Sequence, residues 1–285
     1  MSAGFPIFQT QARSILSPTT GFIAAAGFTH SLTPARNCTF GCTYCYVPTL
    51  RIYGGLKPED WKRWGQFTTV KANAAALLGR QLQPAQRIYC SPLVDPYQPA
   101  EADAKLMPAI LEALCANPPA VFVVQTRGPL IVRDLDALRA LARRTRLRVS
   151  FSLTTDREDV RKLFEPRCAP LQERLEAMAA LREAGIEVYA ALAPILPCDP
   201  EALTQIALEN TSFPIVADPL HIRATKACGA TTREQGVRLA ALRGFTRWLE
   251  AEFQTECTAA MRRLAGNAGR GFATGPEGFS CLAQL

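Results

Sequence analysis

Cys38–Thr39–Phe40–Gly41–Cys42–Thr43–Tyr44–Cys45–Tyr46 is the segment around which the rest of this 285-residue chain is organised. Its cysteines stand at the spacing C-x3-C-x2-C, with an aromatic residue on each side of the last one. Three thiolates can hold three irons of a cubane iron–sulfur cluster, and the fourth iron then has no protein ligand. The spacing predicts a [4Fe–4S] cluster on Cys38, Cys42 and Cys45 whose open iron can bind a small molecule.

A zinc site is the alternative for the same three cysteines. Structural zinc takes four ligands, so a further Cys or His would have to join them. The nearest candidate along the chain is His30, which a loop could bring round. On this alternative the chain is a non-enzymatic zinc or iron–sulfur binding protein.

The pattern C-x3-C-x-aromatic-C resembles the signature of the radical S-adenosylmethionine (SAM) enzymes. In that family SAM binds the open iron, and one electron from the cluster cleaves it to methionine and a 5′-deoxyadenosyl radical, which abstracts hydrogen from a substrate. The resemblance implies a [4Fe–4S] cluster and SAM as cofactors, with Tyr44 against the cluster and the adenine. It also implies an external one-electron reductant, such as flavodoxin or ferredoxin.

Composition bounds the class of protein. The chain is 48% hydrophobic and 20% charged, which is ordinary for a globular protein. No apolar run is long enough to span a bilayer, and no signal peptide is evident at the N-terminus. We therefore expect a cytoplasmic chain without a membrane partner, whose ten cysteines are reduced and serve metal binding, catalysis or packing.

The charge balance permits a nucleic-acid partner without establishing one. The formal net charge is +7, and neutralisation of phosphates gives affinity for nucleic acids. The densest local excess consists of five arginines: Arg139, Arg143, Arg144, Arg146 and Arg148. The alternative interpretation of this cluster is the solvated end of a helix, where cations suit the helix dipole.

Strand and helix patterns alternate from residue 68 onward. Helices are predicted over 68–82, 103–116, 134–144, 171–184, 200–210 and 232–252, and strands over 87–91, 120–124, 147–153, 186–192 and 214–217. This alternation predicts a parallel sheet with right-handed crossovers. About six units are fewer than the eight of a closed barrel. We predict an α/β fold, a partial (β/α)6 TIM-like barrel, which the resemblance also implies.

We expect three parts along the chain. Residues 1–32 form an N-terminal arm, residues 33–225 the partial barrel, and residues 226–285 a C-terminal helical extension packed on the barrel. The carboxyl ends of the strands carry the chemistry in such barrels. Polar groups follow most of the predicted strands, as a polar cofactor requires.

Further segments resemble the spore photoproduct lyase branch of the radical SAM enzymes, including proteins described as DNA repair photolyases. They are residues 94–99 (VDPYQP), 165–175 (EPRCAPLQERL) and 193–195 (API). The resemblance implies SAM contacts from Asp95 and Ser152, and places Arg127 where the lyase has a lysine near the methionine carboxylate. Backbone contacts to adenine are implied for Ala193, Pro194 and Ile195.

The resemblance also implies roles outside the direct SAM contacts. Arg174 is a candidate for closing the site with a salt bridge, and the alternative is a solvated helix arginine. Cys90 corresponds to a lyase cysteine that returns hydrogen to the product radical, with Tyr46 as a relay. Strand alternation could instead point Cys90 away from the mouth and Ser91 toward it. Core packing is the alternative for both Cys90 and Tyr46.

The expected function is a radical SAM enzyme that abstracts hydrogen. The resemblance, together with the basic charge, favours a pyrimidine lesion in a nucleic acid as the substrate. A peptide or small-molecule substrate is the alternative, because a fold does not fix a substrate.

Overall fold

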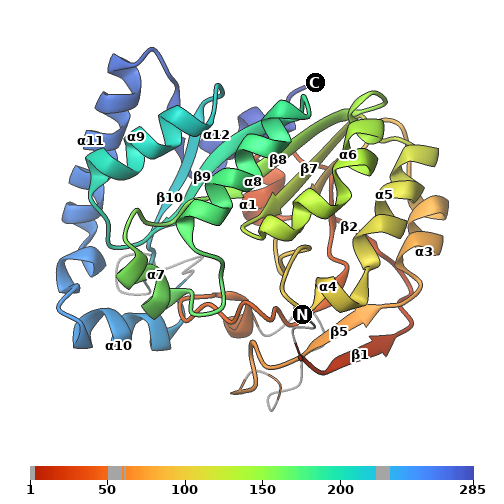
Figure 1. The fold of residues 1–285 in the computed structure, drawn as a ribbon, viewed down its shortest axis with the longest axis horizontal. Coiled ribbons are helices and arrows are strands. Elements are labelled where there is room, and N and C mark those ends of the chain that lie inside the picture. The colour runs from red at the N-terminus through yellow and green to blue at the C-terminus, as the bar shows by residue number, and fades with distance from the viewer. Residues whose placement is uncertain (1–3, 51–59, 61, 223–231) are drawn as a thin grey trace.

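The computed structural model describes residues 4–50, 60, 62–222 and 232–285. Its main feature is an eight-stranded sheet in the order β11-β10-β9-β8-β7-β6-β3-β2, parallel except for β2 (Figure 1). The strands are β2 (Leu16–Pro18), β3 (His30–Leu32), β6 (Arg87–Cys90), β7 (Val121–Thr126), β8 (Arg146–Ser152), β9 (Glu187–Ile195), β10 (Ile215–Pro219) and β11 (Phe272–Thr274). The six consecutive parallel strands from β3 to β10 confirm the partial barrel.

Most of the helices lie along the outer side of the sheet. They are α1 (Gly21–Ala25), α3 (Ala74–Gln81), α4 (Glu101–Ala104), α5 (Leu106–Ala116), α6 (Leu135–Ala142), α7 (Glu158–Phe164), α8 (Leu171–Glu183), α9 (Pro200–Asn210), α10 (Glu234–Leu242), α11 (Ala251–Asn267) and α12 (Gly275–Ser280). Helices α3, α5, α6, α8, α9 and α11 follow one another around the outside (Figure 1). Short 3-10 segments are η1 (Val47–Thr49), η2 (Pro129–Asp134), η3 (Thr246–Leu249) and η4 (Cys281–Ala283).

Strand alternation sorts the buried side chains into two apolar layers. Ile88, Val124 and Phe151 lie on the outer face in a cluster with residues of the surrounding helices. Tyr89 and Val123, one position along their strands, lie on the inner face against α1 and the C-terminal segment. A sheet buried on both faces is typical of parallel strands. The face on which a residue lies therefore decides whether it can reach the barrel interior.

The C-terminal segment is tied to the inner face through Arg148. Its guanidinium donates to the carbonyl oxygens of Leu282 at 2.8 Å and Gln284 at 2.5 Å. Arg148 and Arg146 also form ion pairs with Glu187 at 2.9 and 3.0 Å. Two of the five clustered arginines are therefore already partnered by a carboxylate.

The predicted helix over residues 68–82 was wrong in its first third. Residues Thr68–Lys71 form β5, which joins β1 (Ile7–Thr10) and β4 (Ala35–Arg36) in a separate three-stranded sheet. The run of Thr68, Thr69 and Val70 is β-branched and favours a strand when partners are present. Helix α3 begins only at Ala74.

One predicted helix is divided, and the helix predicted over 232–252 ends early. Lys105 adopts a left-handed conformation at φ 48° between α4 and α5. Gly244, at φ 77°, follows α10 and ends it, and α11 starts seven residues later at Ala251. A glycine just beyond a helix end is a normal stop signal. The elements that were not predicted are helices α1, α7 and α12, most of α11, strands β1 to β5 and strand β11.

The three-part division of the chain stays a prediction, because its second boundary at residue 225 lies outside the described residues. Residues 16–18 and 30–32, within the expected arm, are strands of the main sheet. Within the described residues, no helix combines the length and apolar character that crossing a membrane requires.

Candidate functional site

The cysteine segment lies beyond the carboxyl end of β3 and is held from three sides. Thr39 donates its backbone N–H to Gln98 Oε1 at 2.7 Å, in the loop after β6. Thr43 donates its backbone N–H to the carbonyl of Phe164, the last residue of α7, at 2.9 Å. The carbonyl of Tyr44 accepts the N–H of Arg233, the N-cap of α10, at 2.9 Å. The segment therefore has a fixed shape without regular secondary structure.

The backbone around two of the three cysteine sulfurs favours the thiolate form. Against the larger effect of burial, the backbone of Phe40 and Asp95 acts to lower the pKa of Cys38. The backbone of Val47 acts in the same direction on the pKa of Cys45. Hydrogen bonds to the sulfurs are among the means by which proteins tune iron–sulfur clusters. This backbone environment suits thiolate ligands of a cluster.

The electrostatic setting differs among the cysteines. Burial raises the pKa of Cys45 to about 12 and also raises the pKa of Cys38, where the charge of Asp95 adds to the effect. A contact with Cys168 and the charge of Arg127 lower the pKa of Cys42. Since metal ligands must be thiolates, binding of a cluster at Cys38 and Cys45 releases protons.

A buried carboxylate organises the wall beside the cysteines. Glu165 Oε1 accepts hydrogen bonds from Tyr44 OH at 2.6 Å and Thr154 Oγ1 at 2.9 Å, and it contacts Arg127 Nη1. Its other oxygen accepts from Arg174 Nη2 at 2.5 Å. The four partners come from four different places in the chain. Glu165 therefore connects the cysteine segment, the residues that follow β7 and β8, and helix α8.

The two arginines keep this carboxylate ionised. Burial alone would raise the pKa of Glu165, but the charges of Arg174 and Arg127 lower it to about 2. The guanidinium groups of Arg127 and Arg174 thus lie on either oxygen of one ionised carboxylate. Arg127 Nη1 also lies 3.8 Å from Cys42 Sγ. A positive group beside the cysteines can bind the carboxylate of an amino acid.

Asp95 positions the loop that carries Arg127. Its carboxylate accepts hydrogen bonds from the backbone N–H groups of Arg127 and Tyr97, each at 2.9 Å, and from Thr126 Oγ1 at 2.6 Å. Burial raises the pKa of Asp95, and the bond from Thr126 opposes this. Asp95 thus contacts Arg127 directly, within the group of expected SAM residues.

Ser152 ends a hydrogen-bonded row on the inner face of the sheet. Gln125 Nε2 donates to Ser152 Oγ at 2.8 Å, and Tyr89 OH donates to Gln125 Oε1 at 2.8 Å. Ser150 Oγ, on the same face of β8, is buried and has no hydrogen-bond partner in the described part of the chain. The barrel interior is therefore polar at the carboxyl ends of β7 and β8.

The two expected catalytic residues lie in different surroundings. Tyr46 OH donates to the carbonyl of Pro92 at 2.7 Å, in the loop after β6. Cys90 is fully buried in the outer apolar cluster, on the opposite sheet face from its neighbour Tyr89. Ser91 Oγ lies 3.3 Å from Thr33 Oγ1. The donor role of Cys90 stays a prediction, and its position favours the packing alternative.

The remaining predicted residues occupy the far wall and the end of β9. Arg174 is 2% exposed and pairs with Glu165, so it is not a solvated helix arginine. Ala193 and Pro194 are partly exposed at the end of β9, and Ile195 is buried. The peptide bond between Ala193 and Pro194 is cis. The adenine contacts expected for Ala193, Pro194 and Ile195 stay a prediction.

Sequence reasoning missed the roles of Glu165, Cys168, Gln125 and Tyr89. Glu165 and Cys168 fall in the segment 165–175, whose resemblance to the lyase implies a role for Arg174 alone. Gln125 and Tyr89 could have been found from strand alternation, since each shares a face with the inner residues Val123 and Val121 of β7. Strand alternation predicts the sheet face on which a side chain lies. It does not predict the hydrogen-bond partners of that side chain, which come from other strands.

A family model described as the radical SAM superfamily matches residues 32–202. The chain belongs to the radical SAM superfamily. Membership implies a [4Fe–4S] cluster and SAM as cofactors, and the three thiols with the guanidinium of Arg127 beside Cys42 fit both. Cys38, Cys42 and Cys45 would hold the cluster, and Arg127 would face the carboxylate of SAM. Among the described residues, no three Cys, His, Asp or Glu side chains are already gathered around one point at metal-binding distance.

Two relatives of this radical SAM protein are named as uncharacterized proteins. A protein of Mycobacterium tuberculosis is 30% identical over 178 residues, which make up 61% of this chain and 52% of the relative. A protein of Methanocaldococcus jannaschii is 26% identical over 197 residues, covering 69% of this chain and 70% of the relative. The chain spans about half the length of the mycobacterial relatives it matches.

Solved structures of spore photoproduct lyase have the same fold as this radical SAM protein. One variant of the lyase matches with a TM-score of 0.65 at 15% identity, covering 94% of this chain and 81% of the lyase. A variant with bound AdoMet and a dinucleoside spore photoproduct matches with a TM-score of 0.63 at 15% identity. At this level of identity the likeness establishes the fold.

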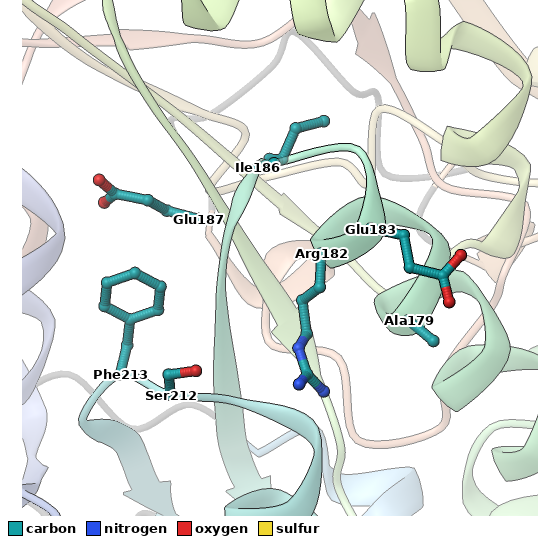
Figure 2. Close-up of a pocket in the computed structure, with 8 residues that line it drawn as sticks. Ala179, Arg182, Glu183, Ile186, Glu187, Ser212 and Phe213 are labelled. Carbon is teal, nitrogen blue, oxygen red and sulfur yellow. The ribbon is translucent and has the colours of Figure 1, made fainter.

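Two other features of this radical SAM protein lie away from the cysteines. A surface hollow of about 520 Å³ lies at the amino end of β9, the opposite edge of the sheet from the cysteine segment. Figure 2 shows Arg182 and Glu183 of α8 there, with Ser212 and Phe213 across β9 from them. His30, the fourth ligand of the zinc alternative, lies in β3, and its Nδ1 is 3.0 Å from Thr29 Oγ1.

Proposed function

We propose that this chain is a radical SAM enzyme that abstracts hydrogen from an organic substrate. With a cluster on Cys38, Cys42 and Cys45, one electron would cleave bound SAM and generate the 5′-deoxyadenosyl radical. An external reductant such as flavodoxin or ferredoxin would supply the electron. A reducing, cytoplasmic compartment would keep the three cysteines available as thiols.

The observation that carries the proposal is the placement of Arg127. Its guanidinium lies beside Cys42 and contacts Glu165, and its backbone N–H donates to the carboxylate of Asp95. A planar guanidinium recognises a carboxylate through two hydrogen bonds. Arg127 would bind the methionine carboxylate of SAM, and Asp95 and Glu165 would fix its orientation. Tyr44, hydrogen-bonded to the same Glu165, would pack against the cluster and the adenine.

The inner face supplies the surroundings of the substrate. The row Tyr89–Gln125–Ser152 would present hydroxyl and amide groups toward SAM at the carboxyl ends of β7 and β8. The apolar inner layer, which includes Phe279 and Leu282, would exclude water from the barrel. A reactive radical requires such exclusion, because water and solvent exposure permit side reactions.

A pyrimidine lesion in a nucleic acid is the proposed substrate, with a lyase-type repair reaction. The shared fold with a lyase solved together with a dinucleoside photoproduct supports this choice, as does the net charge of +7. A lesion within a duplex would have to be flipped out of the stack into the barrel mouth. Salt-dependent binding would be expected, since contacts to phosphates release counterions.

A peptide or small molecule is the second candidate substrate. The observation in its favour is that Arg146 and Arg148 are already paired with Glu187. Part of the most basic stretch is therefore not available for phosphates. Binding of DNA and RNA at low salt separates the two candidates, because a small-molecule enzyme would bind neither.

The decisive experiment is anaerobic reconstitution with iron and sulfide, followed by dithionite and SAM. Formation of 5′-deoxyadenosine above that of a Cys42→Ala control would support the enzyme. The same level in both proteins would reject it and favour a non-enzymatic metal protein. Ultraviolet-irradiated DNA is then added to the active protein, and repaired thymine is measured by mass spectrometry.

A further inference from the structure

A fourth cysteine contacts one of the three expected cluster ligands. The Sγ atoms of Cys42 and Cys168 lie 3.9 Å apart. Both residues are buried, with 7% and 5% of their surface exposed. Cys168 lies in the turn that follows α7, where its N–H donates to the carbonyl of Glu165 at 3.0 Å.

The contact is set by both backbones and not by two mobile side chains. Thr43, next to Cys42, donates its N–H to the carbonyl of Phe164 at 2.9 Å. On the other side, Arg161 Nη1 donates to the carbonyl of Cys168 at 2.6 Å. The first bond joins the Cys42 segment to the end of α7, and the second fixes the turn of Cys168 to the same helix.

We propose that Cys42 and Cys168 form a reversible disulfide whenever the cluster is not bound. A disulfide bond is about 2.05 Å long, so the sulfurs must approach by roughly 2 Å. The two S–H bonds break, one S–S bond forms, and the two thiols lose two electrons and two protons. Hydrogen peroxide is the oxidant: it takes up the two electrons and the two protons and becomes two molecules of water.

The disulfide has a direct consequence for cluster binding. Cys42 supplies one of three ligands, and a sulfur within a disulfide is not a thiolate that can bind iron. The oxidised chain would therefore not take up a cluster until a thiol reductant opened the bond. The bond would also protect Cys42 from irreversible oxidation to sulfinic and sulfonic acids.

Other pairings are possible on this chain, and the test has to separate them. Cys38 and Cys45 lie on the same segment as Cys42. Cys198, in the loop before α9, and Cys257, in α11, are near enough to shift each other's pKa, up for Cys198 and down for Cys257, so they are a further candidate pair. Trypsin resolves the cases, because Cys38, Cys42 and Cys45 share the peptide 37–51 (NCTFGCTYCYVPTLR) and Cys168 lies in 168–174 (CAPLQER).

The experiment uses the full chain, freed of metal with a chelator and treated with one equivalent of hydrogen peroxide. Remaining thiols are alkylated, and the tryptic peptides are analysed by mass spectrometry. We expect peptides 37–51 and 168–174 to be linked, with fragmentation assigning the link to Cys42. Dithiothreitol should remove the link and restore uptake of about four irons per chain.

Variants give the matched comparison. Cys168→Ser should lose the link and still take up iron like the wild type when fully reduced, and Cys38→Ser should keep the link. A link within peptide 37–51 alone, or no link in the oxidised wild type, would overturn the proposal. So would a reduced Cys168→Ser protein that binds as little iron as Cys42→Ser, because Cys168 would then be a cluster ligand. These readouts do not depend on cleavage of SAM, so they stand apart from the proposed function.

Discussion

Arg174 Nη2 lies 2.5 Å from Glu165 Oε2, and the two side chains expose only 2% and 0% of their surface. The other carboxylate oxygen of Glu165, Oε1, accepts a hydrogen bond from Arg127 at the edge of the cysteine segment. A buried ion pair contributes little net stability, but removing one partner leaves an uncompensated charge. The arrangement is therefore better understood as a device that holds Arg127 in place.

Replacement of Glu165 by glutamine tests this role. The Glu165→Gln variant keeps the shape of the side chain and removes the charge between two buried arginines. We expect the free energy of unfolding to fall by about 3 kcal/mol, measured by urea denaturation of the metal-free protein. Glu183→Gln, at an exposed position of α8, is the control and should change it by less than about 0.5 kcal/mol. Equal free energies of unfolding for the two variants would show that the charge of Glu165 does not stabilise the fold.

The pH dependence of stability follows from the same carboxylate. The pKa of Glu165 is lowered to about 2 in the folded chain, against about 4.3 for an ordinary glutamate. Between these values the unfolded chain binds more protons than the folded one, so stability falls as the pH falls. The contribution of Glu165 is complete above about pH 4.5 and is lost toward pH 2. Urea denaturation at several pH values should show the wild type approaching Glu165→Gln over this interval, and parallel curves would contradict the assignment.

Much of this fold follows from local pattern. The helix predicted over residues 200–210 is α9, and the apolar β-branched stretch that begins near residue 120 is β7. The strand at Thr68–Lys71 escaped prediction because its parallel partner, Ile7–Thr10, lies far upstream in the chain. Pairing over such a distance leaves no periodic signal within a short window.

The site, too, contains residues that local sequence predicts and residues that depend on distant contacts. The cysteine spacing is local, and it led directly to Cys38, Cys42 and Cys45. The role of Glu165 depends on partners that meet only in the folded chain, among them Thr154 after β8 and Arg174 in α8. The contact of Cys42 with Cys168 joins residues 126 positions apart. Neither composition nor local spacing predicts contacts between residues so far apart in the sequence.

Substitution of Arg127 should affect SAM more than the cluster. Arg127→Lys keeps the charge but loses the planar fork, and Arg127→Ala loses both. A hydrogen bond to a charged group contributes about 1.5–3 kcal/mol, so Arg127→Ala should weaken SAM binding by roughly ten- to a hundredfold, with Arg127→Lys in between. Equilibrium dialysis of labelled SAM against reconstituted protein measures this. Wild-type affinity in Arg127→Ala at full iron content would remove Arg127 from the SAM site.

The thiol of Cys90 is the subject of a separate prediction. Because it lies in the outer apolar cluster, we expect Cys90→Ala to lower stability by about 1 kcal/mol. The yield of 5′-deoxyadenosine and the product distribution should stay unchanged, measured by liquid chromatography with mass spectrometry. Tyr46→Phe removes the hydroxyl bonded to Pro92 and is the comparison at the mouth of the barrel. A new product formed by Cys90→Ala alone would instead establish Cys90 as the hydrogen donor.

Gly236 gives the last prediction, because α10 packs directly on the cysteine segment there. A Cβ atom on Gly236 would lie 2.8 Å from Cα and 3.0 Å from Cβ of Tyr44, closer than such atoms can approach. Tyr44 stands between Cys42 and Cys45, so a methyl group at Gly236 must displace either α10 or the segment that binds the cluster. Overpacking of this kind costs about 1–3 kcal/mol, partly offset by the better helix propensity of alanine.

We therefore expect Gly236→Ala to lower the free energy of unfolding and to lose iron to a chelator faster than the wild type. Gly79→Ala is the matched control, since Gly79 is exposed in α3 and a Cβ there meets nothing within 4 Å. That substitution should stabilise the chain by about 0.5–1 kcal/mol and leave the rate of iron loss unchanged. If Gly236→Ala keeps iron as long as Gly79→Ala does, α10 does not support the cysteine segment, and the close approach at Tyr44 has no bearing on the cluster.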